Sequence, residues 1–441
     1  MRPLCLDSAK LRAGLAVNGT AQMSRSVPMR VLILTAGCDP TDVGEAWSSF
    51  QWVKRLAEKH DITLLTYRKR NRSSAVEHLP HARVVEWLDL PLMARCDRFN
   101  SMIKPGYLRF YRLARRWIQG ALRRGEHFDL VHQLSPLAIR YPSPAVNCGV
   151  PFIIGPLGGS IETPLGFASE AVHGRWYTRL RGLDRWRLRH DPWLRSTLTA
   201  AEAVIGVAPY VREVLGGIPI RRFETMSETG VVALPEETQM RFNDPAKIRL
   251  LYVGRVIRSK GVRDAVAAMA QLRDLPGVTL DVIGDGDDRP ECQHRAATLG
   301  VSDRTRFHGQ VSRDQLQKYY IQSDAFLFPS FREPSGNVVL EAMSHGLAMV
   351  VAASGGPGSV VTDECGYRIS PLTPEQYTRD LAGAIRDMAH HPARARLMGN
   401  AARQRIRENY LWDRKVQWMD NLYRDVVSAE SLRTTVAGVC A

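Results

Sequence analysis

The stretch Ser323–Ala352, SDAFLFPSFREPSGNVVLEAMSHGLAMVVA, holds the pattern that decides the fold. Its apolar run Ala325–Pro329 predicts a buried strand, and the residues Gly336–His345 follow a helical period. A second apolar run, Ala348–Ala352, follows almost at once and predicts another strand. A strand, a helix and a strand in this order form a βαβ unit, in which the two strands are parallel.

The same alternation of short apolar runs and longer helical periods continues in both directions from this stretch. We therefore expect an α/β protein with two doubly wound parallel sheets in series and a cleft between the carboxyl ends of their strands. The predicted strands are Val31–Thr35, Ile62–Tyr67, Arg83–Trp87, Leu130–Val131, Pro151–Ile154, Ala203–Val207, Arg249–Val253, Thr279–Ile283, Thr305–His308, Ala325–Pro329, Ala348–Ala352 and Tyr367–Ile369.

The domain boundaries follow from where this alternation starts, pauses and ends. Residues 1–28 are expected to be a flexible extension and 29–235 the N-terminal domain. The polar segment 236–248, with Pro245, is the expected linker to a second domain over 249–405. Residues 406–441 are expected to hold a helix that packs back on the first domain, followed by a tail. That helix belongs to one long helical stretch, Ala401–Ser428.

Length and composition agree with two folded domains. The chain has 441 residues, of which 44% are hydrophobic, so wholesale disorder is disfavoured. Its formal net charge of +15 suits an anionic partner, such as a diphosphate, an acidic membrane surface or nucleic acid. The seven cysteines form no CxxC pair, which argues against a zinc site or a disulfide framework. No apolar run reaches the roughly 20 residues of a membrane-spanning helix, and no signal peptide is evident, so we expect a cytoplasmic protein.

Two glutamates flank the predicted helix of the opening stretch. Glu333 precedes the turn at Pro334–Gly336, and Glu341 lies within the helix. The free amides at Gly336, Asn337 and Val338 would form a helix N-terminus, which suits phosphate oxygens. The alternative is structural, with Glu333 favourable to the helix dipole and Glu341 an exposed helix charge.

Cations follow the first strand of the second half. Gly254 ends that strand and allows a ligand to approach the backbone closely. Arg255 and Lys260, in GRVIRSKG, can then form a clamp for a diphosphate and neutralise a departing nucleotide. An ordinary solvated basic loop is the alternative interpretation.

These motifs together resemble the retaining glycosyltransferases of family 4, also called the glycosyltransferase group 1 family. The resemblance covers residues 249 to 425 or so and keeps its motifs in the expected order. They are GRVIRSKG at Gly254–Gly261, IGDGDDR at Ile283–Arg289, FHGQVSRDQL at Phe307–Leu316, SDAFLFPS at Ser323–Ser330 and EPSGNVVLEAMSHG at Glu333–Gly346. The resemblance implies a GT-B fold, in which two Rossmann-like domains face each other across a cleft, and an activity that needs no metal or cofactor.

The resemblance also assigns roles on the donor side. Arg255 and Lys260 would hold the donor diphosphate, Glu333 would contact the sugar hydroxyls, and Glu341 would contact the ribose. Gly336, Asn337 and Val338 would offer backbone amides, and Val311 would meet the base through its backbone. Two positions depart from the family pattern: Ser335 replaces an aromatic residue, and the turn Gly355–Ser359 lacks the usual glutamate.

The N-terminal half offers fewer candidates. Gly44, in the loop after the first strand, could approach the donor phosphates, and His132 stands where family members have a catalytic-face histidine. A structural hydrogen-bonding role is the alternative for His132. Gly158 and Gly159 would permit a loop that faces the acceptor, and a plain turn is the alternative there.

Two segments mix arginines with aromatic residues, namely Tyr107–Arg124 and Arg175–Arg195. Such a mixture suits an anionic membrane surface, so the enzyme could associate peripherally with the inner face of the membrane. The alternative is amphipathic helices with solvated arginines and aromatic residues in the core.

We therefore expect a retaining glycosyltransferase that moves a sugar from a nucleotide-sugar donor to a sugar, lipid-linked or small-molecule acceptor. Cell-envelope or extracellular polysaccharide or glycolipid synthesis is the expected pathway, with natural-product glycosylation as an alternative. A GT-B sugar-nucleotide epimerase is the nearest enzymatic rival. A basic nucleic-acid-binding protein is the non-enzymatic alternative, but no such motif is present, so nucleic acid is not an expected partner.

Overall fold

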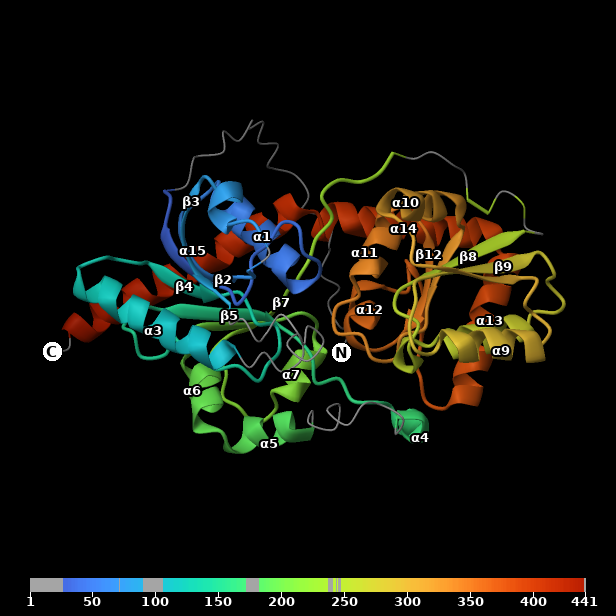
Figure 1. Ribbon diagram of the computed structural model, residues 1–441, viewed down its shortest axis with the longest axis horizontal. Coiled ribbons are helices and arrows are strands. Elements are labelled where there is room, and N and C mark those ends of the chain that lie inside the picture. Colours follow the sequence, from blue (N-terminus) through green and yellow to red (C-terminus); the bar gives the residue numbers. More distant parts are fainter. Residues whose placement is uncertain are drawn as a thin grey trace, which may run out of the picture.

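The computed structural model describes residues 27–70, 72–89, 106–171, 182–236, 241, 242, 244 and 247–439. These residues form two parallel sheets, one of seven strands and one of six. Each sheet carries its own helices, and the two resulting domains lie side by side (Figure 1). The predicted fold class is confirmed. The predicted extension 1–28 lies outside the described residues, apart from residues 27 and 28.

The first sheet has the strand order β3-β2-β1-β4-β5-β6-β7, and all its neighbouring strands are parallel. Six of these strands were predicted. The short β7 was not, because its three residues FET carry too little of an apolar pattern. The strands are β1 Arg30–Leu34, β2 Asp61–Arg68, β3 Ala82–Leu88, β4 Leu130–Gln133, β5 Phe152–Leu157, β6 Ala203–Gly206 and β7 Phe223–Thr225.

Helices cover both faces of this sheet because its strands are apolar on both sides. Alternate residues of a strand point to opposite faces. In β1, Leu32 and Leu34 therefore belong to one buried cluster, and Val31 and Ile33 belong to the other. The helices of this domain are α1 Glu45–Leu56, α3 Tyr107–Arg123, α5 Gly182–His190, α6 Pro192–Ala200 and α7 Tyr210–Val214.

The second sheet has the order β10-β9-β8-β11-β12-β13 and is also parallel throughout. All six strands lie where the sequence predicts them: β8 Ile248–Val253, β9 Val278–Ile283, β10 Thr305–Gly309, β11 Ala325–Phe328, β12 Ala348–Ala352 and β13 Gly366–Ile369. Its helices are α8 Val262–Ala270, α9 Arg289–Thr298, α10 Arg313–Gln322, α11 Asn337–Ser344, α12 Gly355–Val360, α13 Pro374–His390 and α14 Pro392–Asn409.

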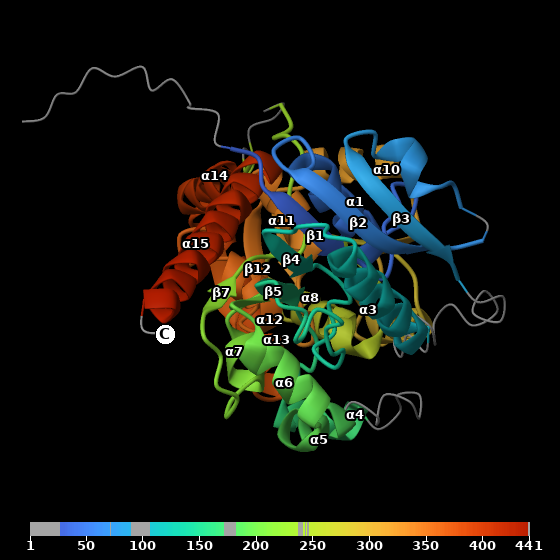
Figure 2. The ribbon, with the colours of Figure 1, turned by 90° about the vertical axis from the view of Figure 1, so that its left-hand side faces the viewer.

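The predicted single helix Ala401–Ser428 is wrong, because the structure divides it. Helix α14 ends at Asn409, and α15 Trp412–Val439 begins after Tyr410 and Leu411. The backbone there leaves the helix to pair with Val231 of the interdomain segment, whose amide donates to the Tyr410 carbonyl at 2.8 Å. Helix α15 then runs back along the first domain (Figure 2), where it buries Trp412 against Trp52.

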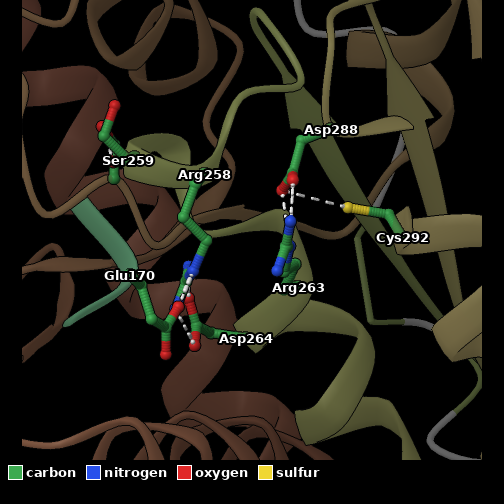
Figure 3. A network of polar contacts seen from close by, with 8 residues as sticks. Glu170, Arg258, Ser259, Arg263, Asp264, Asp288 and Cys292 are labelled. Atoms are coloured by element: carbon green, nitrogen blue, oxygen red, sulfur yellow. Dashed lines mark hydrogen bonds and ion pairs between the residues drawn. The ribbon is translucent and has the colours of Figure 1, made fainter. Parts of the chain in front are cut away.

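A short segment of the N-terminal half lies against the second domain instead of its own. It consists of the 3-10 turn Leu165–Phe167 and α4 Ala168–Ala171, which Figure 1 shows beneath the orange helices. Phe167 is buried within the core of the second domain and packs on Phe331. The Glu170 carboxylate contacts the Arg258 guanidinium, which also pairs with Asp264 at 2.6 Å (Figure 3). This crossing ties the two domains together beside the cleft.

Candidate active site

Lys260 sits in a tight turn at the carboxyl end of β8. The 3-10 turn Arg258–Lys260 ends at Gly261, whose φ of +75° is a conformation that favours glycine. A methyl group on Gly261 would overlap the carbonyl oxygen of Pro329, so the turn packs directly on the loop after β11. This packing carries Lys260 under that loop and leaves the residue only 7% exposed.

The Lys260 ammonium contacts the Glu333 carboxylate, so the structure joins the two predicted donor motifs. Its Nζ also lies 3.3 Å from the carbonyl oxygen of Arg332. Burial lowers the pKa of Lys260, and the Glu333 charge opposes that shift. Little water screens a buried ammonium, so its charge acts strongly on groups beside it.

Arg255 lies next to this pair but remains exposed. Its backbone carbonyl accepts a hydrogen bond of 2.9 Å from the Tyr252 hydroxyl, which fixes the turn after Gly254. The charge of Arg255 is close enough to contribute to the lowered pKa of Lys260. No ion pair or hydrogen bond between described residues occupies its guanidinium, so the group can turn toward a ligand. The neighbouring Arg258 instead belongs to the structural crossing shown in Figure 3.

Helix α11 begins immediately after the Glu333 loop, as the sequence predicts. Its N-cap is Gly336, with φ of +76°, and no side chain caps the first amides. The amides of Asn337 and Val338 thus form an uncapped helix N-terminus. One Glu341 oxygen accepts a 3.0 Å hydrogen bond from the Tyr320 hydroxyl, and burial raises the pKa of the Glu341 carboxyl.

The turn Gly355–Ser359, which departs from the family pattern, packs against the Glu333 loop. The Gly356 amide donates to the Glu333 carbonyl at 3.0 Å. A methyl group on Gly355 would overlap the same carbonyl, and one on Gly356 would overlap the Ser335 carbonyl. The two glycines therefore allow the turn to pack directly on the backbone of the Glu333 loop and fix its position, although the turn lacks the family's glutamate.

The N-terminal domain meets this loop through its own glycines. A Cβ on Gly158 would lie 3.7 Å from the Cβ of Pro334, so the Gly158 loop touches the Glu333 loop. The Gly159 amide donates to the Tyr210 hydroxyl at 3.0 Å, which holds the loop against α7. Gly44 is the N-cap of α1 with φ of +64°, and open space surrounds it.

A cleft of about 1140 Å³ opens between the two domains at this point. One wall is Ser160–Thr163 with parts of α5 and α7, and the other is Arg332 with Ser354–Gly355. The cleft therefore begins where the Gly158 loop and the Glu333 loop meet. Val311, the predicted base contact, lies elsewhere, half-buried between β10 and α10.

His132 is not brought to this cleft. The side chain is 0% exposed at the end of β4. Its Nδ1 lies 2.6 Å from the Tyr423 hydroxyl of α15, and its Nε2 lies 2.7 Å from the Gly155 carbonyl. Both ring nitrogens are thus engaged, and burial lowers the pKa of His132 to about 4. This geometry favours the structural alternative over the predicted catalytic role.

The sequence reasoning missed a carboxyl that the structure places at the domain junction. Glu228 follows β7 in the segment MSETG and is 8% exposed. Ser335 and Asn337 of the donor loop direct their side chains toward it, although they are more than a hundred residues away in the chain. The one available signal was an acidic residue three positions after the end of β7, and β7 itself was too short to predict.

No group of three or more histidine, cysteine or acidic residues within the described part of the chain is arranged to hold a metal ion. The cations that line the cleft are Arg185, Arg189 and Arg332, whereas Lys260 lies beside it, under the Glu333 loop. Whether the activity is independent of metals therefore remains a prediction.

The two facing Rossmann-like domains, with a cation pair and an open helix N-terminus at their junction, define a protein of the GT-B class. Its chain belongs to the group 1 glycosyltransferase family. The model of the group 1 glycosyl transferases matches residues 236–405, and that of the glycosyl transferase 4-like domain matches 44–224. Together these matches cover more than half of the chain and confirm the resemblance stated above.

Two curated relatives and one solved structure illustrate the similarity. A glycogen synthase from Mycobacterium tuberculosis is 37% identical over 168 residues, which span 37% of this chain and 39% of that protein. The lipopolysaccharide core biosynthesis glycosyltransferase LpsE of Rhizobium meliloti is 29% identical over 212 residues, 47% of this chain and 61% of LpsE. The match thus spans less than two thirds of either relative. The Anabaena protein HepE in complex with UDP has a TM-score of 0.62 at 16% identity, covering 90% of this chain and all of that one.

Proposed function

We propose that this protein transfers a glycosyl group from a nucleotide-sugar donor to an acceptor hydroxyl with retention of anomeric configuration. The observation that carries the proposal is the contact between the buried Lys260 ammonium and the Glu333 carboxylate at the N-terminus of α11. This arrangement offers positive charge and backbone amides to a diphosphate, and a carboxylate to sugar hydroxyls, within one loop. The HepE structures with UDP and with UDP-glucose support a donor of this class.

In this mechanism the diphosphate lies between Arg255, Lys260 and the first amides of α11. As the bond between the anomeric carbon and the diphosphate breaks, negative charge grows on the leaving oxygen, and the two cations stabilise it. Glu333 accepts hydrogen bonds from donor hydroxyls and orients the sugar. The acceptor hydroxyl attacks from the same face and passes its proton to the departing phosphate, so no side-chain base is required and configuration is retained.

The acceptor enters through the cleft of about 1140 Å³ beside the Glu333 loop. That volume exceeds a single sugar ring, and its walls carry both charged and polar groups. We propose a sugar or lipid-linked acceptor of cell-envelope or extracellular polysaccharide synthesis, in keeping with LpsE, a glycosyltransferase of lipopolysaccharide core biosynthesis. The alternative is a small-molecule acceptor, and adding both kinds of acceptor to the donor screen described below distinguishes the two.

We also propose that the enzyme rests on an anionic membrane surface through α5 and α6. The aromatic residues of α3 are largely in the core, as the structural alternative expected. Trp186 and Trp193, however, are 57% and 56% exposed and lie among basic residues. No helix in the described ranges is long and apolar enough to cross a bilayer. Sedimentation with phosphatidylglycerol vesicles tests this surface, and binding that survives Trp186→Ser plus Trp193→Ser contradicts it.

A donor screen tests the proposed function. The purified protein is incubated with UDP-, GDP-, TDP- and ADP-sugars in buffer with EDTA, and thermal stabilisation and slow sugar release are measured. We expect one nucleotide class to stabilise the protein and to release sugar with retained configuration. Adding candidate acceptors then accelerates donor consumption. Conversion of the donor to an epimeric nucleotide sugar without any acceptor would contradict the proposal, and so would the lack of response to every donor.

A further inference from the structure

Glu228 occupies a position at the domain junction that none of the roles above uses. It lies in the segment after β7, and its backbone is fixed from two sides. The Trp52 indole donates to the Glu228 carbonyl at 2.8 Å, and the Lys415 ammonium donates to the neighbouring Ser227 carbonyl at 2.6 Å. The carboxyl is thus held on a rigid support between α1 and α15, and its side chain extends toward the donor loop.

The side chain of Glu228 is buried without full compensation. Its Oε2 atom is inaccessible to solvent and has no hydrogen-bond partner. The Oδ1 atom of Asn337, at the first turn of α11, is likewise buried and unpartnered. Unsatisfied buried polar atoms are costly and are commonly satisfied by a ligand. The side chains of Ser335 and Asn337 hydrogen-bond to the Glu228 carboxyl, which places its unpartnered Oε2 atom beside the helix N-terminus that we assign to the donor phosphates.

Charged and titratable groups on the neighbouring elements influence the Glu228 carboxyl electrostatically. Burial is the largest cause that raises the pKa of Glu228 to about 7, and the charges of Glu45 at the start of α1 and Glu333 of the donor loop add to it. Hydrogen bonds from the side chains of Ser335 and Asn337 oppose this shift. Lys415 of α15 and Tyr210 of α7 are also within electrostatic range. Burial holds the pKa of Lys415 well below its ordinary value, and no ion pair between described residues joins Lys415 to Glu228.

We propose that Glu228 binds the donor diphosphate as a neutral carboxyl, donating its proton in a hydrogen bond to a phosphate oxygen, so that donor binding takes up one proton. An ionised carboxylate at this place would repel the diphosphate, whereas a carboxylic acid adds a further donor to those of Arg255, Lys260 and the α11 amides. The proton comes from solvent, and no covalent bond changes. This inference rests on the proposed function, because it assumes a diphosphate at the N-terminus of α11.

The consequence is a donor affinity that depends on pH near neutrality. In the free protein the neutral form of Glu228 is the major species below about pH 7 and the minor species above it. Only the neutral form binds the donor, so the donor affinity should fall about tenfold between pH 6 and pH 8. Loss of the proton from Lys260 at higher pH acts in the same direction, so a variant of Glu228 must separate the two groups.

The test is calorimetric titration with nucleotide sugars from pH 6 to pH 8.5, in buffers of low and high ionisation enthalpy. The probes are UDP-glucose, GDP-mannose, TDP-glucose and ADP-glucose. Free nucleotides are unsuitable, because their terminal phosphate titrates near pH 6. The variants are Glu228→Gln, which keeps a neutral hydrogen-bond donor, and Glu77→Gln, which removes a charge from an exposed position of the same domain.

We expect the parent and Glu77→Gln to lose about tenfold in affinity and to take up close to one proton at pH 8. Glu228→Gln should bind with an affinity that is nearly constant over this range and without proton uptake. A parent that binds the donor with flat affinity and no uptake overturns this inference and leaves the proposed function standing. Uptake that is as large in Glu228→Gln as in the parent overturns it as well. Absence of binding by the parent at every pH overturns the proposed function itself.

Discussion

Replacing Lys260 by methionine tests the donor clamp most directly. Methionine keeps most of the buried stem but removes the ammonium that contacts Glu333 and lies 3.3 Å from the Arg332 carbonyl. A hydrogen bond to a charged group contributes about 1.5–3 kcal/mol. Because Lys260 is only 7% exposed, solvent screens little of this energy. Loss of one such bond to the diphosphate should weaken donor binding about 10- to 150-fold.

The effect on the chemical step should be larger than the effect on binding. Charge grows on the leaving diphosphate in the transition state, and removal of one preorganised donor to such an oxygen typically costs about 10²–10³ in kcat. Donor Kd is measured by calorimetry and the chemical step by single-turnover sugar transfer or release. The control is Lys247→Met, which removes an exposed lysine just before β8, at the opposite edge of the same sheet. Its surface pair with Asp244, at 3.6 Å, contributes little.

Lys260→Met also leaves the Glu333 carboxylate without its partner, so a general loss of folding must be separated from a loss of binding. The double variant Lys260→Met plus Glu333→Gln removes both charges and should recover thermal stability without recovering donor binding. The clamp is refuted if Lys260→Met binds donor and turns it over as the Lys247→Met control does.

Two further predictions concern the support of the site. Gly261→Ala should lower both stability and donor affinity, because the added methyl group overlaps the Pro329 carbonyl beside Lys260. Gly300 has a similar φ of +68° with open space around it, so Gly300→Ala should lower the free energy of unfolding by only about 1 kcal/mol, measured by thermal unfolding, and should bind the donor normally. Equal behaviour of the two variants would contradict the packing argument. Burial lowers the pKa of His132 to about 4 in the folded protein, against about 6.5 in the unfolded chain. The neutral imidazole therefore costs no stability above pH 6.5, and the free energy of unfolding should fall by about 3 kcal/mol as the pH drops from 6.5 toward 4. Chemical denaturation should show a shallower loss over that window in His132→Gln than in the exposed-site control His294→Gln; identical slopes would argue against a buried neutral imidazole.

The local part of the site could be predicted because its residues are close in sequence. Glu333, Gly336 and Glu341 lie on one loop and the helix that follows it, so their spacing alone places them around one helix N-terminus. The same holds for Gly254, Arg255 and Lys260, which follow one strand. The strands themselves were predictable since buried parallel strands are continuous apolar runs.

The remaining features depend on contacts between distant parts of the chain. The break between α14 and α15 arises because Tyr410 pairs with Val231, and no helix-breaking residue in the sequence marks it. The role of His132 is set by Tyr423, 291 residues away. Both residues look ordinary in their own sequence neighbourhoods, so local patterns could not reveal these contacts.

The sequence by itself therefore determined the two parallel sheets and the donor loop, because periodicity and short motifs encode local conformation. Only the tertiary structure decided which side chains meet at the junction of the domains. It brought the Lys260 ammonium to Glu333, turned His132 into the core, and set Glu228 beside Asn337. Burial and charge at that junction depend on how the chain segments pack, and this packing is the physical reason why spacing along the chain could not predict them.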